Sequence, residues 1–368
     1  MLTKFAVKNY RGFYNRIEWD LSHPSNYSFK SEAIRNGVVK NGIIYGDNGS
    51  GKTNMGLAIF DIANHLSHKW KKIDYYQNFE SASLTQTPVE FEYWFVFNDK
   101  EVYYKYSKVS KEEKGIIVEE QLLVNGKELF YKDVDTVRIL ETFEVQTAAK
   151  ERLQADNNNI SMVNYILSSV PLSKDHALIS LCDFVENMLF FRSLDNREFI
   201  GLMNERSNIE EYIINNKYTE DFSEYLKVVS GQSFTFAEPL PGEKRLYCIM
   251  SGAKIPFLQV ASTGTINLEL QFFWLKEMAS ASFVFIDEFD AFYHYELSYE
   301  VAKCLFQGNK QVFLTTHDTY LLSNELLRPD CYFILKDNEI NPICDLTNKE
   351  IRLGHNLEKL YRGGTFDK

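Results

Sequence analysis

The sequence predicts an α/β fold that is interrupted by an antiparallel β-meander and by a helical insertion. A short β-branched strand runs into a glycine-rich loop and then a helical pattern over residues 37–66. Strands and helices alternate again after residue 267, whereas hairpin-like strands occupy residues 88–133. Alternating strands and helices are typical of a parallel sheet with helices on its faces. We therefore expect one α/β core that a long intervening segment splits.

The chain is expected to divide into three parts. Residues 1–133 hold the N-terminal lobe, with the glycine loop followed by the meander. Residues 134–232 are polar with helical spacing, which predicts a helical insertion for interaction or oligomerisation. Residues 233–368 return to strands and helices and form the C-terminal lobe, with helices expected at 267–278 and 295–306.

Composition excludes several classes of protein. The 368 residues are 45% hydrophobic and carry a net charge of −11, which is typical of a folded domain and argues against a surface that coats nucleic acid. The five cysteines are scattered without a close pair, so we expect reduced thiols. The sequence has neither a signal-peptide pattern nor a run long enough to span a membrane, which predicts a cytoplasmic protein.

The glycine-rich loop carries the strongest chemical signal. Residues 46–53 read GDNGSGKT and fit G-x-x-x-x-G-K-[ST] at every fixed position. Backbone N–H groups of such a loop converge on phosphate oxygens, while its lysine reaches the β/γ-phosphates and its hydroxyl binds Mg²⁺. The alternative is an ordinary glycine turn that caps a helix. The residues expected to contact nucleotide here are Asn48, Gly49, Ser50, Gly51, Lys52, Thr53 and Asn54.

An apolar strand at 283–286 supplies the acidic partner that such a loop needs. Asp287 and Glu288 follow it directly, at the end of the strand where α/β sheets place their ligands. Asp287 is expected to hold Mg²⁺ together with Thr53, and Glu288 to polarise the attacking water. The alternative is a strand that simply leaves the core at a charged edge.

A second apolar strand, 312–316, ends at His317, one strand-helix unit after the two carboxylates. A single histidine after a strand is often only a surface or core residue. At this position, however, a group that senses the γ-phosphate would be expected. We therefore predict three catalytic residues, Lys52, Glu288 and His317.

In this order the segments GDNGSGKT, FVFIDEFD and VFLTTHD resemble the Walker A, Walker B and switch-histidine elements of ABC-type ATPases. More narrowly they resemble the SMC/RecF/OLD-like branch of bacterial AAA-class ATPases, and the opening KNYRGF fits that branch as well. The resemblance implies a P-loop NTPase head that uses ATP and Mg²⁺. It also implies that Arg11 lies near the nucleotide.

The resemblance further implies that two copies of the chain sandwich two ATP molecules. Ser262 and Gly264 stand where the family's signature motif would contact the partner's γ-phosphate; the alternative is an ordinary helix cap by Ser262 or Thr265. Asp290 matches the family's inter-subunit aspartate, or else caps a helix. The family's magnesium-linked glutamine is Gln86 or Gln146, and the sequence does not choose between them.

The end of the chain, GHNLEKLYRGGTFDK, resembles stand-alone ATPases of bacterial abortive-infection and phage-defence systems. This implies an ATP-driven switch that associates with itself and acts with a separate effector nuclease or toxin. The alternative is a RecF-like or SMC-like repair ATPase that clamps DNA directly, so DNA or RNA is a further candidate partner. A third alternative is a scaffold that binds ATP without hydrolysing it.

Overall fold

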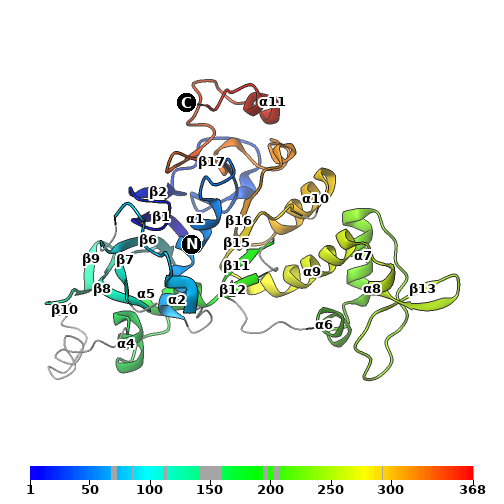
Figure 1. Cartoon of the computed structure of the whole chain (residues 1–368), viewed down its shortest axis with the longest axis horizontal. Helices are drawn as coiled ribbons and strands as arrows, with labels where there is room; N and C mark the ends of the chain where they lie inside the picture. Colours follow the sequence, from blue (N-terminus) through cyan, green and yellow to red (C-terminus); the bar gives the residue numbers. More distant parts are fainter. Residues whose placement is uncertain are drawn as a thin grey trace.

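Two seven-stranded sheets and a projecting lobe of helices make up the molecule (Figure 1). The computed structural model describes residues 1–67, 73–84, 87–111, 114–140, 160–193, 198–201, 208–291 and 293–367.

The first sheet is an antiparallel meander. Its strands are β1 (Leu2–Lys8), β2 (Ile17–Asp20), β6 (Val89–Phe97), β7 (Lys100–Lys111), β8 (Lys114–Val124), β9 (Lys127–Lys132) and β10 (Val137–Ile139). They lie in the order β10-β9-β8-β7-β6-β1-β2, so the opening strands of the chain extend the meander that the sequence predicts further on.

Two of the hairpin turns of this sheet form at pairs of Asn, Asp and Gly residues, within the segment where the sequence predicts hairpin-like strands. Asn98 and Asp99 join β6 to β7 with φ angles of 46° and 63°, and Asn125 and Gly126 join β8 to β9 with 49° and 73°. Two successive positive φ angles define the hairpin turn whose twist matches that of the strands, and Asn, Asp and Gly tolerate them best.

The second sheet is mostly parallel and holds the glycine loop. Its strands are β5 (Asn41–Tyr45), β11 (Met188–Arg192), β12 (Glu198–Gly201), β15 (Phe283–Asp287), β16 (Gln311–Thr315), β17 (Tyr332–Lys336) and β18 (Glu339–Pro342). Their order is β12-β11-β15-β16-β5-β17-β18, with antiparallel strands only at the two edges. All residues of β5, β15 and β16 are buried, as expected for strands covered on both faces.

The strands β11 and β12 fall inside residues 134–232, where the sequence predicts helices. The segment MLFFR of β11 pairs in parallel with β15, from Met188 opposite Phe283 to Arg192 opposite Asp287. A five-residue apolar run cannot be assigned to strand or buried helix by its periodicity. Its partner strand lies more than ninety residues further along the chain, so no local signal points to the pairing.

Helices cover the parallel sheet and build the lobe on the right of Figure 1, where α6 to α9 and β13 lie. The α-helices are α1 (Lys52–Ile59), α2 (Asp61–Leu66), α4 (Met162–Ser169), α5 (Ala177–Glu186), α6 (Ile209–Asn215), α7 (Thr219–Ser230), α8 (Phe257–Val260), α9 (Thr263–Glu277), α10 (Tyr295–Leu305) and α11 (Leu357–Arg362). Short 3-10 helices are η1 (Ser31–Ala33), η2 (Ile73–Tyr76), η3 (Met278–Ser280), η4 (Thr319–Leu321) and η5 (Pro329–Cys331). Two small hairpins pair β3 (Ile34–Arg35) with β4 (Val38–Val39) and β13 (Tyr247–Met250) with β14 (Ala253–Pro256).

The two sheets pack face to face through aromatic side chains. The indole of Trp19 on β2 meets the rings of Phe313 and Phe333, with centroids 4.6 and 5.5 Å apart. Between the sheets, the buried side chain of Gln311 accepts a hydrogen bond from the Leu2 N–H at 2.8 Å and donates to the Leu2 carbonyl at 2.9 Å. One side-chain amide therefore pairs with a strand of the other sheet as a backbone would.

A buried ion pair joins the helices after the glycine loop to the meander. Lys108 Nζ on β7 lies 2.6 Å from Asp61 Oδ1 on α2, and both side chains are at most 2% exposed. Tyr106 donates to the same carboxylate oxygen at 2.8 Å. Removing either charge would leave the other unpaired in the interior, at a cost of about 3–5 kcal/mol.

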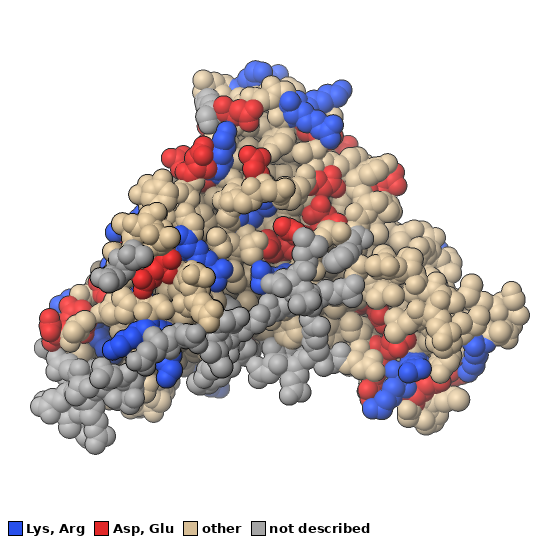
Figure 2. Space-filling view, in the orientation of Figure 1, with Lys and Arg blue, Asp and Glu red and all other residues tan. Residues whose placement is uncertain are grey.

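Charged side chains of both signs are interspersed over the face seen in Figure 2, and no broad basic surface covers it. None of the helices in the described ranges is long and apolar enough to cross a lipid bilayer.

Candidate nucleotide-binding site

The glycine loop connects β5 to α1 in a conformation that only glycine adopts easily. Gly49 and Gly51 have φ angles of 80° and 103°. A Cβ atom on Gly46 would lie 2.5 Å from Ser50 Oγ and 2.6 Å from the carbonyl oxygen of Leu335. The loop therefore requires glycine at three of its positions.

Lys52, the first residue of α1, holds its ammonium group inside this loop. Its Nζ donates to the carbonyl oxygens of Gly46 at 2.8 Å and Asp47 at 3.1 Å, and the residue is 5% exposed. Burial lowers the pKa of Lys52, although the charges of Asp287, Glu288 and Asp47 act in the opposite direction. An ammonium group bonded only to neutral carbonyls has unused capacity to bind phosphate oxygens.

Asp287 at the end of β15 connects the loop to the neighbouring strand. Its Oδ2 accepts from the hydroxyl of Thr53 at 2.6 Å, and its Oδ1 accepts from the hydroxyl of Thr315 at 2.7 Å. The Thr315 oxygen in turn accepts from the backbone N–H of Glu288 at 2.8 Å. Thr315, which the sequence analysis did not single out, therefore positions both acidic residues. Only the register of β15 against β16 reveals this role.

The oxygen atoms of Thr53 and Asp287 suit Mg²⁺, which prefers hydroxyl and carboxylate ligands and completes its shell with substrate phosphates and water. The loop also contains Ser50 Oγ, a buried hydroxyl without a hydrogen-bond partner among the described residues. A buried hydroxyl without a partner is costly unless a ligand or water satisfies it. The residues present therefore fit a nucleotide with its magnesium ion.

Glu288, His317 and Asp290 lie at the carboxyl ends of β15 and β16. Glu288 has a φ of 48°, an uncommon conformation for a residue other than glycine, and its side chain is half-buried. His317 follows β16 and is exposed. Burial raises the pKa of Asp290, although a hydrogen bond from Thr316 acts to lower it. The residue that caps α10 is His294, so Asp290 is not the helix cap considered from the sequence.

Arg11 lies in a turn between β1 and β2 that approaches the glycine loop. The ring of Phe13 would lie 2.9 Å from a Cβ on Gly51, and Asn54 Nδ2 lies 3.8 Å from the Cβ position of Gly12. The guanidinium of Arg11 is 5.5 Å from the centre of the Tyr10 ring, and its Nε is buried without a hydrogen-bond partner among the described residues. Asn48, in contrast, is exposed within the loop.

Ser262 and Gly264 belong to the helical lobe. Ser262 is the N-cap of α9: its hydroxyl accepts from the Thr265 N–H at 3.2 Å and lies 2.8 Å from the Thr265 hydroxyl. In the ranges that the structure describes, the hydrogen bonds of Ser262 stay within this cap. A Cβ on Gly264 would meet only Ser262 Oγ, at 3.7 Å, so this helix end is open.

The structure thus brings Lys52, Thr53, Asp287 and Glu288 into one place, with His317 at the end of the adjacent strand. It does not bring the N-terminus of α9 into hydrogen-bond contact with them. The two glutamines considered from the sequence, Gln86 and Gln146, lie outside the described residues.

One family model matches part of the chain. Residues 192–323 match a family model described as "AAA domain, putative AbiEii toxin, Type IV TA system". No curated protein matches the sequence.

Among solved structures, an SMC head bound to the C-terminal winged-helix domain of ScpA is 15% identical, with 93% of this chain and 97% of that chain covered and a TM-score of 0.47. The SMC head domain from Thermotoga maritima is 14% identical, with coverages of 93% and 98% and a TM-score of 0.43. An Smc head bound to the C-terminal domain of ScpA from Pyrococcus furiosus is 14% identical, with coverages of 92% and 95% and a TM-score of 0.45.

Proposed function

We propose that this chain is an ATPase with an ABC-type head, that ATP joins two copies of it, and that hydrolysis separates them. The observation that carries the proposal is the division of the site. The loop, Thr53, Asp287 and Glu288 are assembled within one copy, whereas the open end of α9 at Ser262 and Gly264 forms no hydrogen bond to them within the described residues. A second copy, related by a two-fold axis, can place its α9 over this loop and receive the same contact in return.

The residues of the assembled half suit the binding of ATP. The loop N–H groups, Ser50 and Lys52 would hold the β- and γ-phosphates, and Thr53 with Asp287 would hold Mg²⁺. When bound, Mg²⁺ would neutralise part of the negative charge of the phosphates. The helix end at Ser262 would add a positive dipole and a hydroxyl to the γ-phosphate of the partner's ATP.

Glu288 and His317 are proposed to act on hydrolysis. The water oxygen forms a bond to the γ-phosphorus, the bond from that phosphorus to the ADP oxygen breaks, and the water proton passes to the Glu288 carboxylate. His317 at the end of β16 would contact the γ-phosphate and report its loss. Asp290 is hydrogen-bonded to Thr316 and feels the charge of His317, and it would act at the contact between copies.

Mixing two inactive variants tests the shared site. Lys52→Ala removes the phosphate-binding ammonium, and Gly264→Glu places a carboxylate against the partner's γ-phosphate. The second change suits the free chain, because the position is open and acidic residues are favourable at a helix N-terminus. A mixed dimer contains one intact site, and mixed dimers form half of a random population, so an equimolar mixture should recover about a quarter of wild-type turnover.

Phosphate release measures this recovery, and the matched control is each variant alone at the same total concentration. If the mixture is no more active than the variants alone, although the wild type hydrolyses ATP, each copy is catalytically complete and the shared site is excluded.

We further propose that the switch serves a prokaryotic anti-phage system and controls a separately encoded nuclease or toxin. The description of the matching family, with its toxin and toxin–antitoxin terms, supports this role. The other candidate, direct clamping of DNA, predicts duplex binding that requires ATP and weakens steeply with salt. The net charge of −11 favours the defence role, and ATP-dependent, salt-sensitive binding by the purified chain alone would overturn that preference.

A further inference from the structure

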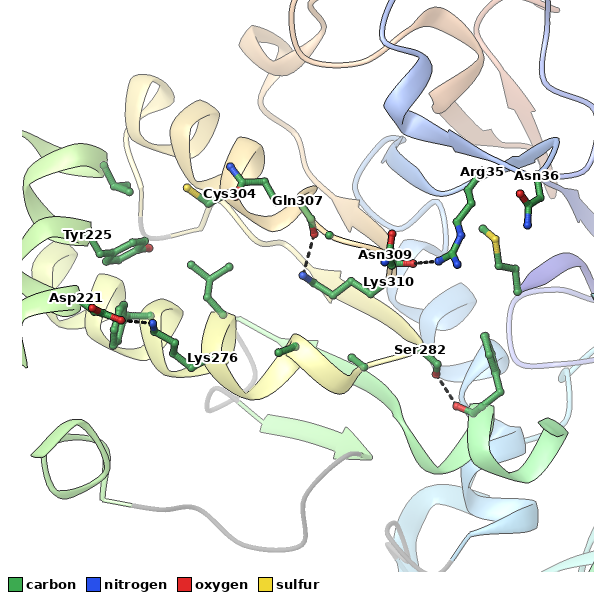
Figure 3. Close-up of a pocket in the computed structure, with 18 of the residues that line it drawn as sticks. Arg35, Asn36, Asp221, Tyr225, Lys276, Ser282, Cys304, Gln307, Asn309 and Lys310 are labelled. Atoms are coloured by element: carbon green, nitrogen blue, oxygen red, sulfur yellow. Dashed lines mark hydrogen bonds and ion pairs between the residues drawn. The ribbon is translucent and has the colours of Figure 1, made fainter. Parts of the chain in front are cut away.

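A cavity of about 1110 Å³ opens at the edge of the parallel sheet where β15 and β16 begin (Figure 3). Ser282, directly before β15, and Lys310, directly before β16, both line it. The same two strands end at Asp287 and Thr315 in the nucleotide site. The cavity is therefore at the opposite edge of the sheet and is separate from that site.

One end of this cavity is strongly basic. Arg35 and Lys310 line it, and Lys40 donates to the carbonyl of Gly308, which lines it too. Their side chains donate to three carbonyls of one turn: Arg35 Nη1 to Asn309 at 3.0 Å, Lys40 Nζ to Gly308 at 2.8 Å, and Lys310 Nζ to Gln307 at 3.1 Å. Within the described ranges, none of the three cations forms an ion pair with a carboxylate.

The positive charges of Arg35 and Lys40 act on neighbouring lysines of this group. Burial and the charge of Arg35 lower the pKa of Lys40, which only Glu32 partly opposes. Burial and the charge of Lys40 lower the pKa of Lys310 in the same way. Neighbouring like charges with only neutral partners destabilise the charged forms, and an anion placed between them would remove that cost.

The other walls of the cavity differ from this end. Lys276 lines the far side and pairs with Asp221 at 2.5 Å, so its charge is already balanced. Phe184, Phe272 and Leu275 provide apolar surface between the two ends. The cavity thus offers unbalanced positive charge at one end, next to apolar surface, which is typical of a small-molecule site with few polar anchors.

We propose that this cavity binds a small molecule that carries phosphate groups, with the phosphates at Arg35 and Lys310 and the body of the molecule against Phe272 and Leu275. The planar guanidinium suits bidentate contact with a phosphate, and the lysine adds a point charge. Lys40 strengthens the field without touching the ligand. The size of the cavity is ample for a nucleotide-sized molecule.

Calorimetric titration of inorganic pyrophosphate into full-length protein tests the site. The background is Lys52→Ala, so that the glycine loop contributes no phosphate binding. Pyrophosphate should bind this protein, and adding Arg35→Gln with Lys310→Gln should weaken the binding about tenfold or more, because two charged hydrogen-bond donors are lost. Lys303→Gln is the matched control: Lys303 is exposed, pairs with Glu300, and should leave the affinity unchanged.

The single variant Arg35→Gln keeps the test valid if the double change impairs folding, since Arg35 is exposed. It should weaken pyrophosphate binding severalfold while the melting temperature stays that of the background. The proposal is overturned if pyrophosphate does not bind to the Lys52→Ala protein. It is also overturned if Arg35→Gln binds pyrophosphate as tightly as the background or the Lys303→Gln control.

Discussion

Charged side chains at the two edges of the parallel sheet have different partners. At the carboxyl edge, Asp287 accepts hydrogen bonds from two hydroxyls, and its neighbour Glu288 is fixed through one of them. At the amino edge, the hydrogen bonds of Lys40 and Lys310 within the described residues go to backbone carbonyls. The first edge is organised before ligand arrives, whereas the positive charge of the second forms no ion pair with a carboxylate within the described residues. Preorganisation suits catalysis, and unbalanced charge suits capture of an anion.

The largest effect is expected from Glu288→Gln at the carboxyl edge. The amide cannot accept the proton of the attacking water, so turnover should fall a hundredfold or more, within the roughly 10²–10⁴-fold that a positioned general base supplies. ATP binding should persist because the glycine loop is unchanged. Steady-state phosphate release and equilibrium binding of labelled ATP measure the two quantities. Turnover equal to wild type would show that this carboxylate is not the base.

A smaller loss is expected from Thr315→Val, which keeps the shape of the side chain and removes the hydroxyl between Asp287 and Glu288. Two buried polar groups then lose their partner, which should lower the free energy of unfolding by about 1–3 kcal/mol. Turnover should fall about tenfold, and half-maximal turnover should require more Mg²⁺, because the carboxylate is no longer held.

Thr315→Ser is the control for this variant, since it retains the hydroxyl and should restore the magnesium requirement. Urea unfolding and a magnesium titration of ATPase activity provide the measurements. A valine variant that loses stability but keeps the wild-type magnesium requirement would reduce Thr315 to a packing residue.

The smallest effect is expected from Lys40→Met at the amino edge. Burial holds the pKa of Lys40 below its ordinary value of 10.5, so the unfolded chain binds this proton more tightly than the folded chain. Wild-type stability should therefore rise as pH increases from neutral towards 10.5, and the variant should lack this contribution. At pH 7 the variant should be as stable as wild type or more stable by about 1 kcal/mol.

Denaturant unfolding at pH 7 and pH 9.5 gives the comparison, with Lys303→Met as an exposed control. A Lys40→Met protein that is clearly less stable at pH 7 would mean that the lysine stabilises this edge, and the contrast between the two edges would disappear.

Much of the nucleotide site follows from short segments of the sequence. The glycine loop and the strand before Asp287 can each be identified from the local sequence, because the glycine spacing and the apolar run lie within a few consecutive residues. The structure adds Thr315, whose hydroxyl acts across two strands and depends on their register. It also adds β11, since MLFFR acquires its strand partner only in the folded sheet.

The basic cavity could not be predicted in this way. Arg35 and Lys40 precede Lys310 by more than 260 residues in the sequence. Each of the three has the local sequence of an ordinary surface residue. The sheet brings them together because β16 lies directly beside β5. The net charge of −11 therefore gives no indication of this local group of positive charges.

The side chain of Gln311 has a consequence for unfolding. Gln311 is the first residue of β16, and Thr315 is the last. The Gln311 side chain is hydrogen-bonded to both the backbone N–H and the carbonyl of Leu2 in the meander. The meander cannot separate from the parallel sheet without exposing these buried groups unpaired. The Leu2 amide should therefore exchange its hydrogen only when both sheets open together, which makes the two sheets a single cooperative unit.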